Sequence, residues 1–257
     1  MAQNNNNHPI FAIIGGSGLT RLANLEMTRR KVVRTPYGEP SGALTFGRVQ
    51  GCEVVFLARH GYGHTIPPHE VNYRANIWAL HAQQIKFVVS VASVGGIRAD
   101  LAPGTLVVPD QIIDYTWGRD ATFFGTSEHG VTHIDFTHPY CDRVRRLCIE
   151  AARRAGEPMA DGGVYATTQG PRLETAAEVE RLKRDGADMV GMTGMPEAVL
   201  AREIGLCYGA IAVVTNYAAG RAASRDGISM SGISDALKET MTRVAHIIGE
   251  LAAINGN

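Results

Sequence analysis

Short runs of apolar and β-branched residues recur along this 257-residue chain, and several of them end directly in glycine or a small polar residue. Runs of this length with such boundaries are typical of buried strands. We therefore predict strands at 11–14, 43–49, 53–58, 87–92, 105–108, 163–168 and 206–215. Strands of this kind need helices over the faces of their sheet.

Helical patterns lie between the later runs. Their apolar spacing predicts helices at 71–83, 142–154, 175–184, 196–203 and 231–252. In the last of these, Ile233, Leu237, Met241, Val244 and Ile248 recur at helical spacing. Because the first strands follow one another and the later strands alternate with helices, we expect an α/β fold with a mixed sheet covered on both sides.

No linker interrupts residues 10–257, so we expect one domain there. Residues 1–9 are rich in asparagine and lack the apolar core of a signal peptide, which predicts a short disordered tail. Residues 118–140 follow neither the helical nor the strand period. A connection of that length within a compact domain commonly serves a functional site or a subunit contact.

Charge and composition argue against several classes of function. Lysine and arginine together number 25, as do aspartate and glutamate, whereas nucleic-acid binders usually show a strong basic excess. No apolar run approaches the roughly 20 residues of a membrane helix. The four cysteines lack zinc spacing and favour reduced thiols in a cytoplasmic protein over a disulfide framework.

Three predicted strands end in residues that suit an anion. Glycine-rich turns follow two of them, at 15–18 with Ser17 and at 92–96 with Ser93. Glycines let backbone N–H groups approach an anion, and each turn adds a hydroxyl. Arg59 and His60 end the third strand, where α/β folds place ligands and where a guanidinium can bind phosphate in a bidentate way. Each feature alone could be structural, but together they predict an anion cradle.

A metal site is the other interpretation of this region, because His60, His64 and His69 are close in sequence. Glycines and prolines interrupt their spacing, so the three imidazoles share no helix face, and no HExxH pattern is present. We therefore expect no metal. The chain also lacks a GxSxG turn and any signature of a catalytic cysteine.

Polar side chains also mark three later junctions. Glu174 or Thr175 could cap the helix that follows them, and Thr193 is either a phosphate donor or a cap. Asn216 ends an almost wholly apolar strand, where an amide has little structural use unless it forms a turn. Each of these residues therefore has a structural and a functional interpretation.

Longer strings around these residues resemble one family. GGSGL, ARHGxxHxxPPHxVNYRANIWAL, HxDFTHPYC, GPRLETxAE and GMTGMPEAVLARE are similar to the trimeric branch of the purine nucleoside phosphorylase and methylthioadenosine phosphorylase family. The chain resembles in particular the bacterial members that act on S-methyl-5'-thioinosine. The resemblance implies a single domain around a partly barrel-like mixed sheet, a homotrimer and a role in purine salvage. It also implies phosphorolysis with phosphate as co-substrate and without a metal or organic cofactor.

The resemblance also implies roles for individual residues. The positions matching the family's phosphate site are Ser17, Arg59, His60, Ala92, Ser93 and Thr193, and those matching its substrate site are Glu174, Met192, Asn216, Tyr217, Ala218, Ile233 and His133. Met192 matches a residue that packs against ribose and base, and His133 matches one that reaches the 5' end of a neighbouring subunit's substrate. Asn216, beside purine N7, and His60 are the expected catalytic residues.

Asn216 and Glu174 indicate which purine is bound. Adenine-specific methylthioadenosine phosphorylases carry Asp-Tyr-Asp where this chain has Asn216, Tyr217 and Ala218, and serine where it has Glu174. An aspartate accepts from the adenine amino group but repels a 6-oxo oxygen, whereas an asparagine can donate to that oxygen and accept from a protonated N7. A carboxylate at position 174 suits the N1–H of hypoxanthine or guanine. We therefore expect a 6-oxopurine.

Ile233 indicates the 5' group. Family members that cleave inosine and guanosine place a histidine for the 5'-hydroxyl near this position, and an apolar wall suits a methylthio group instead. The predicted reaction is phosphorolysis of S-methyl-5'-thioinosine to hypoxanthine and 5-methylthioribose 1-phosphate. The alternatives are a 6-oxopurine (inosine/guanosine) nucleoside phosphorylase, a methylthioadenosine phosphorylase and a non-catalytic purine-binding protein. The full phosphate set argues against the last of these.

Overall fold

The computed structural model describes residues 11–125 and 130–256, so the tail expected at 1–9 lies outside the described residues. The strands are β1 Phe11–Gly15, β2 Glu26–Lys31, β3 Leu44–Val49, β4 Cys52–Ala58, β5 Phe87–Gly96, β6 Leu106–Val108, β7 Gln111–Asp114, β8 Met159–Asp161, β9 Val164–Thr167, β10 Met189–Gly191 and β11 Cys207–Tyr217. The helices are α1 Tyr73–His81, α2 Asp142–Arg154, α3 Ala176–Arg184, α4 Gly194–Glu203 and α5 Met230–Gly256, with a 3-10 turn η1 at Ala222–Ser224.

The long strand β5 organises the sheet. It pairs in parallel with β1 on one edge and with β11 on the other. β4 extends the β1 side in parallel, and β3 and β2 follow it as antiparallel strands. The end of β5 also pairs with β10, which leads on to β9 and β7. Because β1, β4, β5 and β11 run in one direction, their carboxyl ends meet where α/β proteins bind ligands.

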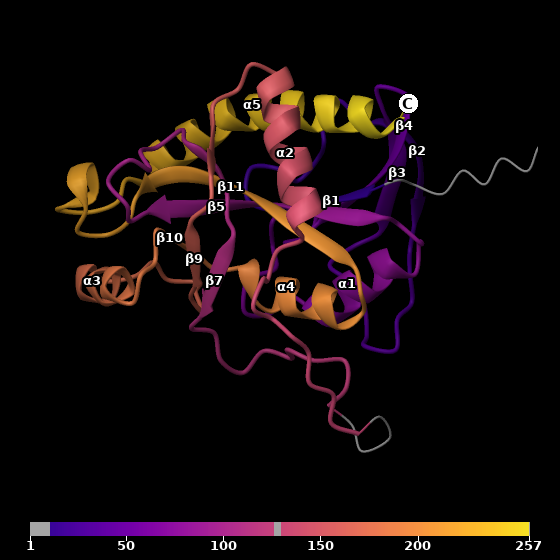
Figure 1. The fold of residues 1–257 in the computed structure, drawn as a ribbon, viewed down its shortest axis with the longest axis horizontal. Helices are drawn as coiled ribbons and strands as arrows, with labels where there is room; N and C mark the ends of the chain where they lie inside the picture. The colour runs from indigo at the N-terminus through magenta and orange to yellow at the C-terminus, as the bar shows by residue number, and fades with distance from the viewer. Residues whose placement is uncertain (1–10, 126–129, 257) are drawn as a thin grey trace, which may run out of the picture.

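Helices cover both faces of this sheet (Figure 1). α2 and α5 pack on one face, where Val144 and Val244 join the same apolar cluster as Ile13. α1 and α4 lie on the other face, where Ile77 packs in a second cluster with Ile14. Adjacent residues of one strand point to opposite faces. β1 is therefore buried on both sides, as its unbroken apolar sequence predicts.

Every strand and helix predicted from the sequence is present, and the α/β fold with a mixed sheet flanked by helices is confirmed. The prediction missed β2, β7, β8 and β10. β2 has the sequence EMTRRK, and all six of its side chains are exposed at the outer edge of the sheet. Charged side chains discourage an edge strand from pairing with other chains, but they also remove the apolar pattern that reveals a strand.

The other missed strands are three or four residues long, too short to show a period. The described parts of 118–140 contain neither helix nor strand, as predicted. In the portions of the chain that the structure describes, no helix is both long and apolar enough to cross a membrane.

Candidate active site

A cavity of about 610 Å³ opens where β1, β4, β5 and β11 end. Its lining is drawn from segments that are far apart in the sequence. They contribute Ser17, Arg59, His60, His64, Thr65, Ile66, Pro67, Pro68, Ala92, Ser93, Val94, Gly95, Pro171, Leu173, Glu174, Val190, Gly191, Met192, Thr193, Thr215, Asn216, Ala218, Ile228, Met230, Ile233 and Leu237. All of the predicted site residues lie on this lining except Tyr217 and His133.

The predicted anion cradle forms one part of the cavity. Ser17 lies in the loop after β1, Ala92 and Ser93 belong to β5, and Thr193 precedes α4. Thr193 occupies the N-cap position of α4, yet its side chain makes no capping hydrogen bond. Its hydroxyl, which interacts with the Tyr165 phenol, is thus not used in the helix cap and can also serve a ligand in the cavity.

Arg59 is completely buried beneath this cradle. Its Nε and Nη2 lie 2.5 and 3.0 Å from the two carboxylate oxygens of Glu197. Nη2 also donates to the Ser90 hydroxyl at 2.6 Å, and Nη1 donates to the Val91 carbonyl at 3.1 Å. A guanidinium has five N–H groups, so one on Nη1 remains. Glu197 therefore occupies the bidentate face of Arg59 that the sequence led us to expect for phosphate.

The free N–H of Arg59 is close to the first glycine-rich turn. A Cβ on Gly16 would lie 2.8 Å from Nη1 of Arg59 and 2.6 Å from the Val91 carbonyl oxygen, so only glycine fits there. Burial alone would lower the pKa of Arg59, but the adjacent Glu197 carboxylate outweighs this effect and raises that pKa. Arg59 therefore stays charged while its charge is balanced inside the protein.

His60 is held as a neutral imidazole. Its Nδ1 lies 2.8 Å from the Ile66 carbonyl oxygen, which can only accept, so Nδ1 carries the proton and Nε2 carries the lone pair. Burial, reinforced by the positive charge of Arg59, lowers the pKa of His60 to about 4. At neutral pH His60 can accept a hydrogen bond or a proton, but it brings no positive charge to an anion.

Asn216 reaches the cavity through an irregularity in β11. The pairing of β11 with β5 shifts register between Val214 and Asn216, which makes Thr215 an extra residue. Bulges of this kind re-aim side chains beside active sites. The Thr215 hydroxyl donates to Oδ1 of Asn216 at 2.9 Å, and Nδ2 of Asn216 donates to the Tyr217 carbonyl at 2.7 Å. The amide keeps one N–H to donate and one oxygen lone pair to accept.

Glu174 lies on the cavity lining, and a hydrogen bond from Thr168 orients its carboxylate. The Thr168 hydroxyl donates to Oε1 of Glu174 at 2.6 Å. The residue that caps α3 is Thr175, whose side chain accepts from the Glu178 N–H while Glu178 accepts from the Thr175 N–H. Glu174 is thus free of the capping role, and its Oε2 is left to face a ligand.

Four apolar side chains line a further part of the cavity: Ile228, Met230, Ile233 and Leu237. They come from the segment before α5 and from the first turns of that helix. Leu237 also packs against the glycine turn after β1, because a Cβ on Gly18 would lie 3.2 Å from its Cδ2. This apolar part includes Ile233, the residue expected near the 5' group.

Two predicted site residues lie elsewhere. Tyr217 lines a separate hollow with Arg98 and Lys183, so the side chain after Asn216 is turned away from the cavity. His133 is exposed on the irregular segment and does not line the cavity of its own chain.

In the described residues, 11–125 and 130–256, no group of three or more His, Cys, Asp or Glu side chains could hold a metal ion.

Sequence reasoning missed the residues behind the cradle. The hydroxyls of Ser90 and Tyr208 donate to Oε2 of Glu197 at 3.0 and 2.8 Å, which completes the surroundings of its carboxylate. One signal was present: Glu197 is a charge in the largely apolar string that forms α4. A charge that is fully buried needs a partner of opposite sign.

Comparison with known proteins identifies the family. The model of the family described as the phosphorylase superfamily matches residues 10–253. The chain belongs to the phosphorylase superfamily.

Two related proteins of this superfamily are similar to the chain over most of its length. The protein of Pseudomonas syringae pv. tomato named probable S-methyl-5'-thioinosine phosphorylase is 50% identical over 235 residues, which are 91% of this chain and 95% of the relative. The 6-oxopurine nucleoside phosphorylase of Pyrococcus furiosus is 44% identical over 251 residues, covering 96% of this chain and 92% of the relative.

Solved phosphorylase structures share the fold closely. Methylthioadenosine phosphorylase from Schistosoma mansoni in complex with adenine matches with a TM-score of 0.91 and 35% sequence identity, covering 96% of this chain and 92% of that chain. A variant of the same enzyme in complex with methylthioadenosine matches with a TM-score of 0.90 and 35% identity over the same shares. These structural relatives bind a purine base and a purine nucleoside. The fold and the family predicted from the sequence are therefore confirmed.

Proposed function

We propose that this phosphorylase, a pentosyltransferase, cleaves S-methyl-5'-thioinosine with inorganic phosphate into hypoxanthine and 5-methylthioribose 1-phosphate. One observation carries the proposal: a single cavity joins the anion cradle, the polar pair Asn216 and Glu174, and the apolar residues around Ile233. These three parts suit, in turn, a phosphate, a 6-oxopurine and a methylthio group. Relatives named for this reaction at 50% and 48% identity support the same substrate.

The cradle binds and orients the nucleophile. Hydroxyls of Ser17, Ser93 and Thr193, backbone N–H groups and the free N–H of Arg59 donate to phosphate oxygens. Nε2 of His60 accepts a hydrogen bond from the protonated oxygen of hydrogen phosphate. Holding phosphate against C1' of the nucleoside removes much of the entropic cost of bringing the two reactants together.

The base end receives the leaving group. As a phosphate oxygen bonds to C1', the C1'–N9 bond breaks and its electron pair passes to the purine. N7 of the purine takes up a proton from solvent, and hydrogen phosphate releases its proton to solvent in exchange. The free lone pair of Asn216 Oδ1 accepts from N7–H, and its free N–H donates to O6. Oε2 of Glu174 accepts from N1–H. Adenine has an acceptor at N1 and a donor at position 6, so it would leave these groups wrongly paired.

A 6-oxopurine nucleoside phosphorylase is the second candidate, since a relative of that name is 44% identical. It would use the same base end, so the two functions differ only at the 5' group. Ile228, Met230, Ile233 and Leu237 give a 5'-hydroxyl no hydrogen-bond partner, whereas they provide apolar contacts for a methylthio group. The apolar part of the cavity therefore favours the methylthio substrate.

We also propose a cytoplasmic homotrimer, which rests on the family resemblance. His133 is exposed, as we expect of a residue that reaches the substrate of a neighbouring subunit. Cys52, Cys141, Cys148 and Cys207 are all free thiols, which accords with a reducing compartment. Analytical ultracentrifugation should give three times the chain mass, and a monomer with full activity would contradict the assembly.

The test of function is a phosphate-dependent cleavage assay on S-methyl-5'-thioinosine, inosine and methylthioadenosine side by side. We expect the highest kcat/KM on S-methyl-5'-thioinosine. Preference for inosine would keep the base assignment and reject the 5' assignment. Preference for methylthioadenosine would reject the base assignment, and no cleavage of any substrate would favour a purine-binding protein.

A further inference from the structure

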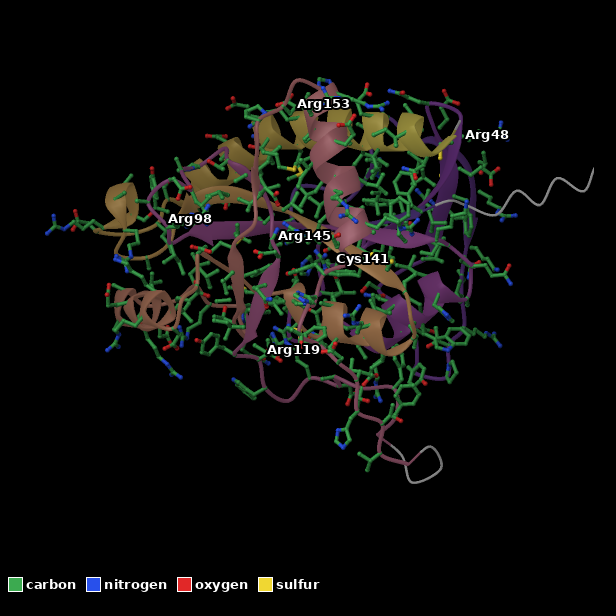
Figure 2. All side chains as sticks on the ribbon, viewed as in Figure 1. Arg48, Arg98, Arg119, Cys141, Arg145 and Arg153 are labelled. Atoms are coloured by element: carbon green, nitrogen blue, oxygen red, sulfur yellow. The ribbon has the colours of Figure 1, made fainter. Side chains whose placement is uncertain are left out.

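Arg119, a half-buried residue labelled in Figure 2, has an unusual set of partners for an arginine. Its contacts are four backbone carbonyls and one hydroxyl, drawn from three separate parts of the chain. Nη1 contacts the carbonyl oxygens of Met192 and Met195 at 2.8 and 2.7 Å and the Tyr73 hydroxyl at 3.2 Å, and Nη2 contacts those of Gln169 and Thr168 at 2.8 and 3.4 Å.

None of these partners is a carboxylate, so the guanidinium is not engaged in neutralising a charge. Its Nε is buried and has no partner within the described part of the chain. The ring of Tyr73 lies 5.4 Å from the guanidinium carbon, close enough for a cation–π contact. Such an arrangement fixes the positions of the backbone segments whose carbonyls it binds.

Those segments are two loops of the nucleoside cavity. Thr168 and Gln169 begin the turn that leads to Glu174, and Met192 and Met195 flank Thr193. Arg119 does not line the cavity itself, so it acts on both loops from outside.

The two loops touch each other without any space between them. A Cβ on Gly170 would collide with Sδ of Met192, and the Thr168 hydroxyl holds Glu174 at 2.6 Å. A small separation of the loops would therefore move both Met192, on the ribose side, and Glu174, on the base side.

We propose that Arg119 is a positioning residue of the nucleoside site, which holds the loop at 168–171 against the loop at 192–195. This inference rests on the proposed function, because it assigns Glu174 and Met192 to the nucleoside. Arginine is needed because its planar fork reaches several acceptors at once. Lysine would keep the charge but would lose the fixed geometry of the donors.

The test compares Arg119→Ala and Arg119→Lys with the parent enzyme, measuring KM for nucleoside, KM for phosphate and kcat separately. Arg119→Ala should raise the nucleoside KM about tenfold or more, since sub-ångström misplacement of site groups is costly. The phosphate KM should change less than about threefold, because Thr193 is the one cradle residue on a loop that Arg119 holds, whereas Ser17, His60 and Ser93 lie on other segments. Arg119→Lys should raise the nucleoside KM about threefold while keeping the parent Tm.

Rescue of the nucleoside KM by guanidinium ion at low millimolar concentration distinguishes a positioning role from a general loss of stability. It should enter the space left in Arg119→Ala and lower the nucleoside KM, without affecting the parent enzyme. The matched control is Arg172→Ala, on the turn that leads to Glu174. The Arg172 side chain is exposed and forms an ion pair with Glu178 at 2.7 Å. Its kinetic constants should equal those of the parent.

Three results would overturn the proposal: an unchanged nucleoside KM in Arg119→Ala, an equal rise of both KM values without rescue, or the same effect in Arg172→Ala. If Arg119→Ala does not fold, an unchanged nucleoside KM in Arg119→Lys overturns it instead. The parent enzyme tests the proposed function in the same experiment, and the variants are compared on whichever nucleoside it cleaves best. If it cleaves none, calorimetric affinity for hypoxanthine replaces KM, and equal affinity of parent and Arg119→Ala rejects the role of Arg119.

Discussion

Arg59 meets both carboxylate oxygens of Glu197 in an ion pair that solvent does not reach on either side. The pair lies directly beneath the turn that contains Gly16. Because His60 is neutral and Arg59 is compensated, a phosphate in the proposed cradle would meet directed hydrogen bonds and little net positive charge.

Substitutions in the Arg59–Glu197 pair should distinguish its contribution to the free energy of unfolding from its contribution to turnover. Glu197→Leu leaves a buried guanidinium without its partner and should lower the free energy of unfolding by about 3–5 kcal/mol in urea denaturation. The double variant Arg59→Met with Glu197→Leu removes both charges and should recover most of that loss. Its phosphate-dependent turnover should nevertheless stay about a hundredfold or more below the parent. A stable double variant with parental turnover would show that Arg59 has no part in binding phosphate.

His60 should remain uncharged well below neutral pH. Burial and Arg59 hold its pKa at about 4 in the folded protein, against about 6.5 in the unfolded chain. Between these values the unfolded chain binds the extra proton and the folded chain does not. The associated stability is therefore complete above pH 6.5 or so and is lost as pH falls toward 4. NMR titration of the His60 ring, assigned with His60→Gln, should give a midpoint near 4, and a midpoint near 6.5 would contradict the buried neutral imidazole.

Thr168→Val should weaken nucleoside binding through Glu174. The variant loses the hydrogen bond of 2.6 Å that orients the carboxylate. One such bond is worth about 1 kcal/mol, so the KM for 6-oxopurine nucleosides should rise about fivefold while the phosphate KM stays unchanged. Thr116→Val is the control, since the Thr116 hydroxyl donates to Asp114 outside the cavity. Equal effects of the two substitutions would argue against an orienting role for Thr168.

Exchanging three side chains should change the preferred base from a 6-oxopurine to adenine. Asn216→Asp together with Ala218→Asp and Glu174→Ser replaces the donors and acceptors that suit a 6-oxopurine with a set that suits adenine. The ratio of kcat/KM for S-methyl-5'-thioinosine over methylthioadenosine should fall by about a hundredfold or more, because mispaired buried polar groups discriminate strongly. An unchanged ratio would mean that these positions do not recognise the base.

The 5' preference should depend on Ile233. Ile233→His places a polar side chain among Ile228, Met230 and Leu237 and gives a 5'-hydroxyl a partner. The kcat/KM for inosine should rise relative to S-methyl-5'-thioinosine by about tenfold, which corresponds to about 1.4 kcal/mol. Ser231→His, on the exposed side of the same turn, is the matched control. A shift of equal size in both variants would remove Ile233 from the 5' site.

The sequence predicted the central strands because their apolar runs are unbroken, and the α-helices of the described residues because their apolar side chains recur at helical spacing. It could not reveal β2, where six exposed side chains carry no apolar period. Within the site, it predicted the residues that end strands or glycine-rich turns, such as Ser17 and Asn216, because their positions are set by local pattern.

The rest of the site depends on long-range packing. The pairing of Arg59 with Glu197 joins residues 138 positions apart, and local spacing cannot show it. The family resemblance placed Tyr217 in the substrate site beside Asn216, its neighbour in sequence, but in the structure the Tyr217 side chain lines another hollow. Adjacent residues of an extended strand point to opposite faces, so sequence proximity to a site residue is a weak guide to membership of the site.

The extra residue at Thr215 makes the last positions of β11 sensitive to chain length more than to residue type. A regular strand reverses the facing of every side chain after a shift of one residue. If β11 paired with β5 without this shift, Thr215 would lie opposite Gly95 and Asn216 opposite Gly96, and the directions of Asn216 and Tyr217 would be exchanged. In a population of variants, a one-residue insertion between Thr215 and Asn216 should therefore be eliminated more severely than a substitution of Thr215, because the added residue would move Asn216 to the position opposite Gly96.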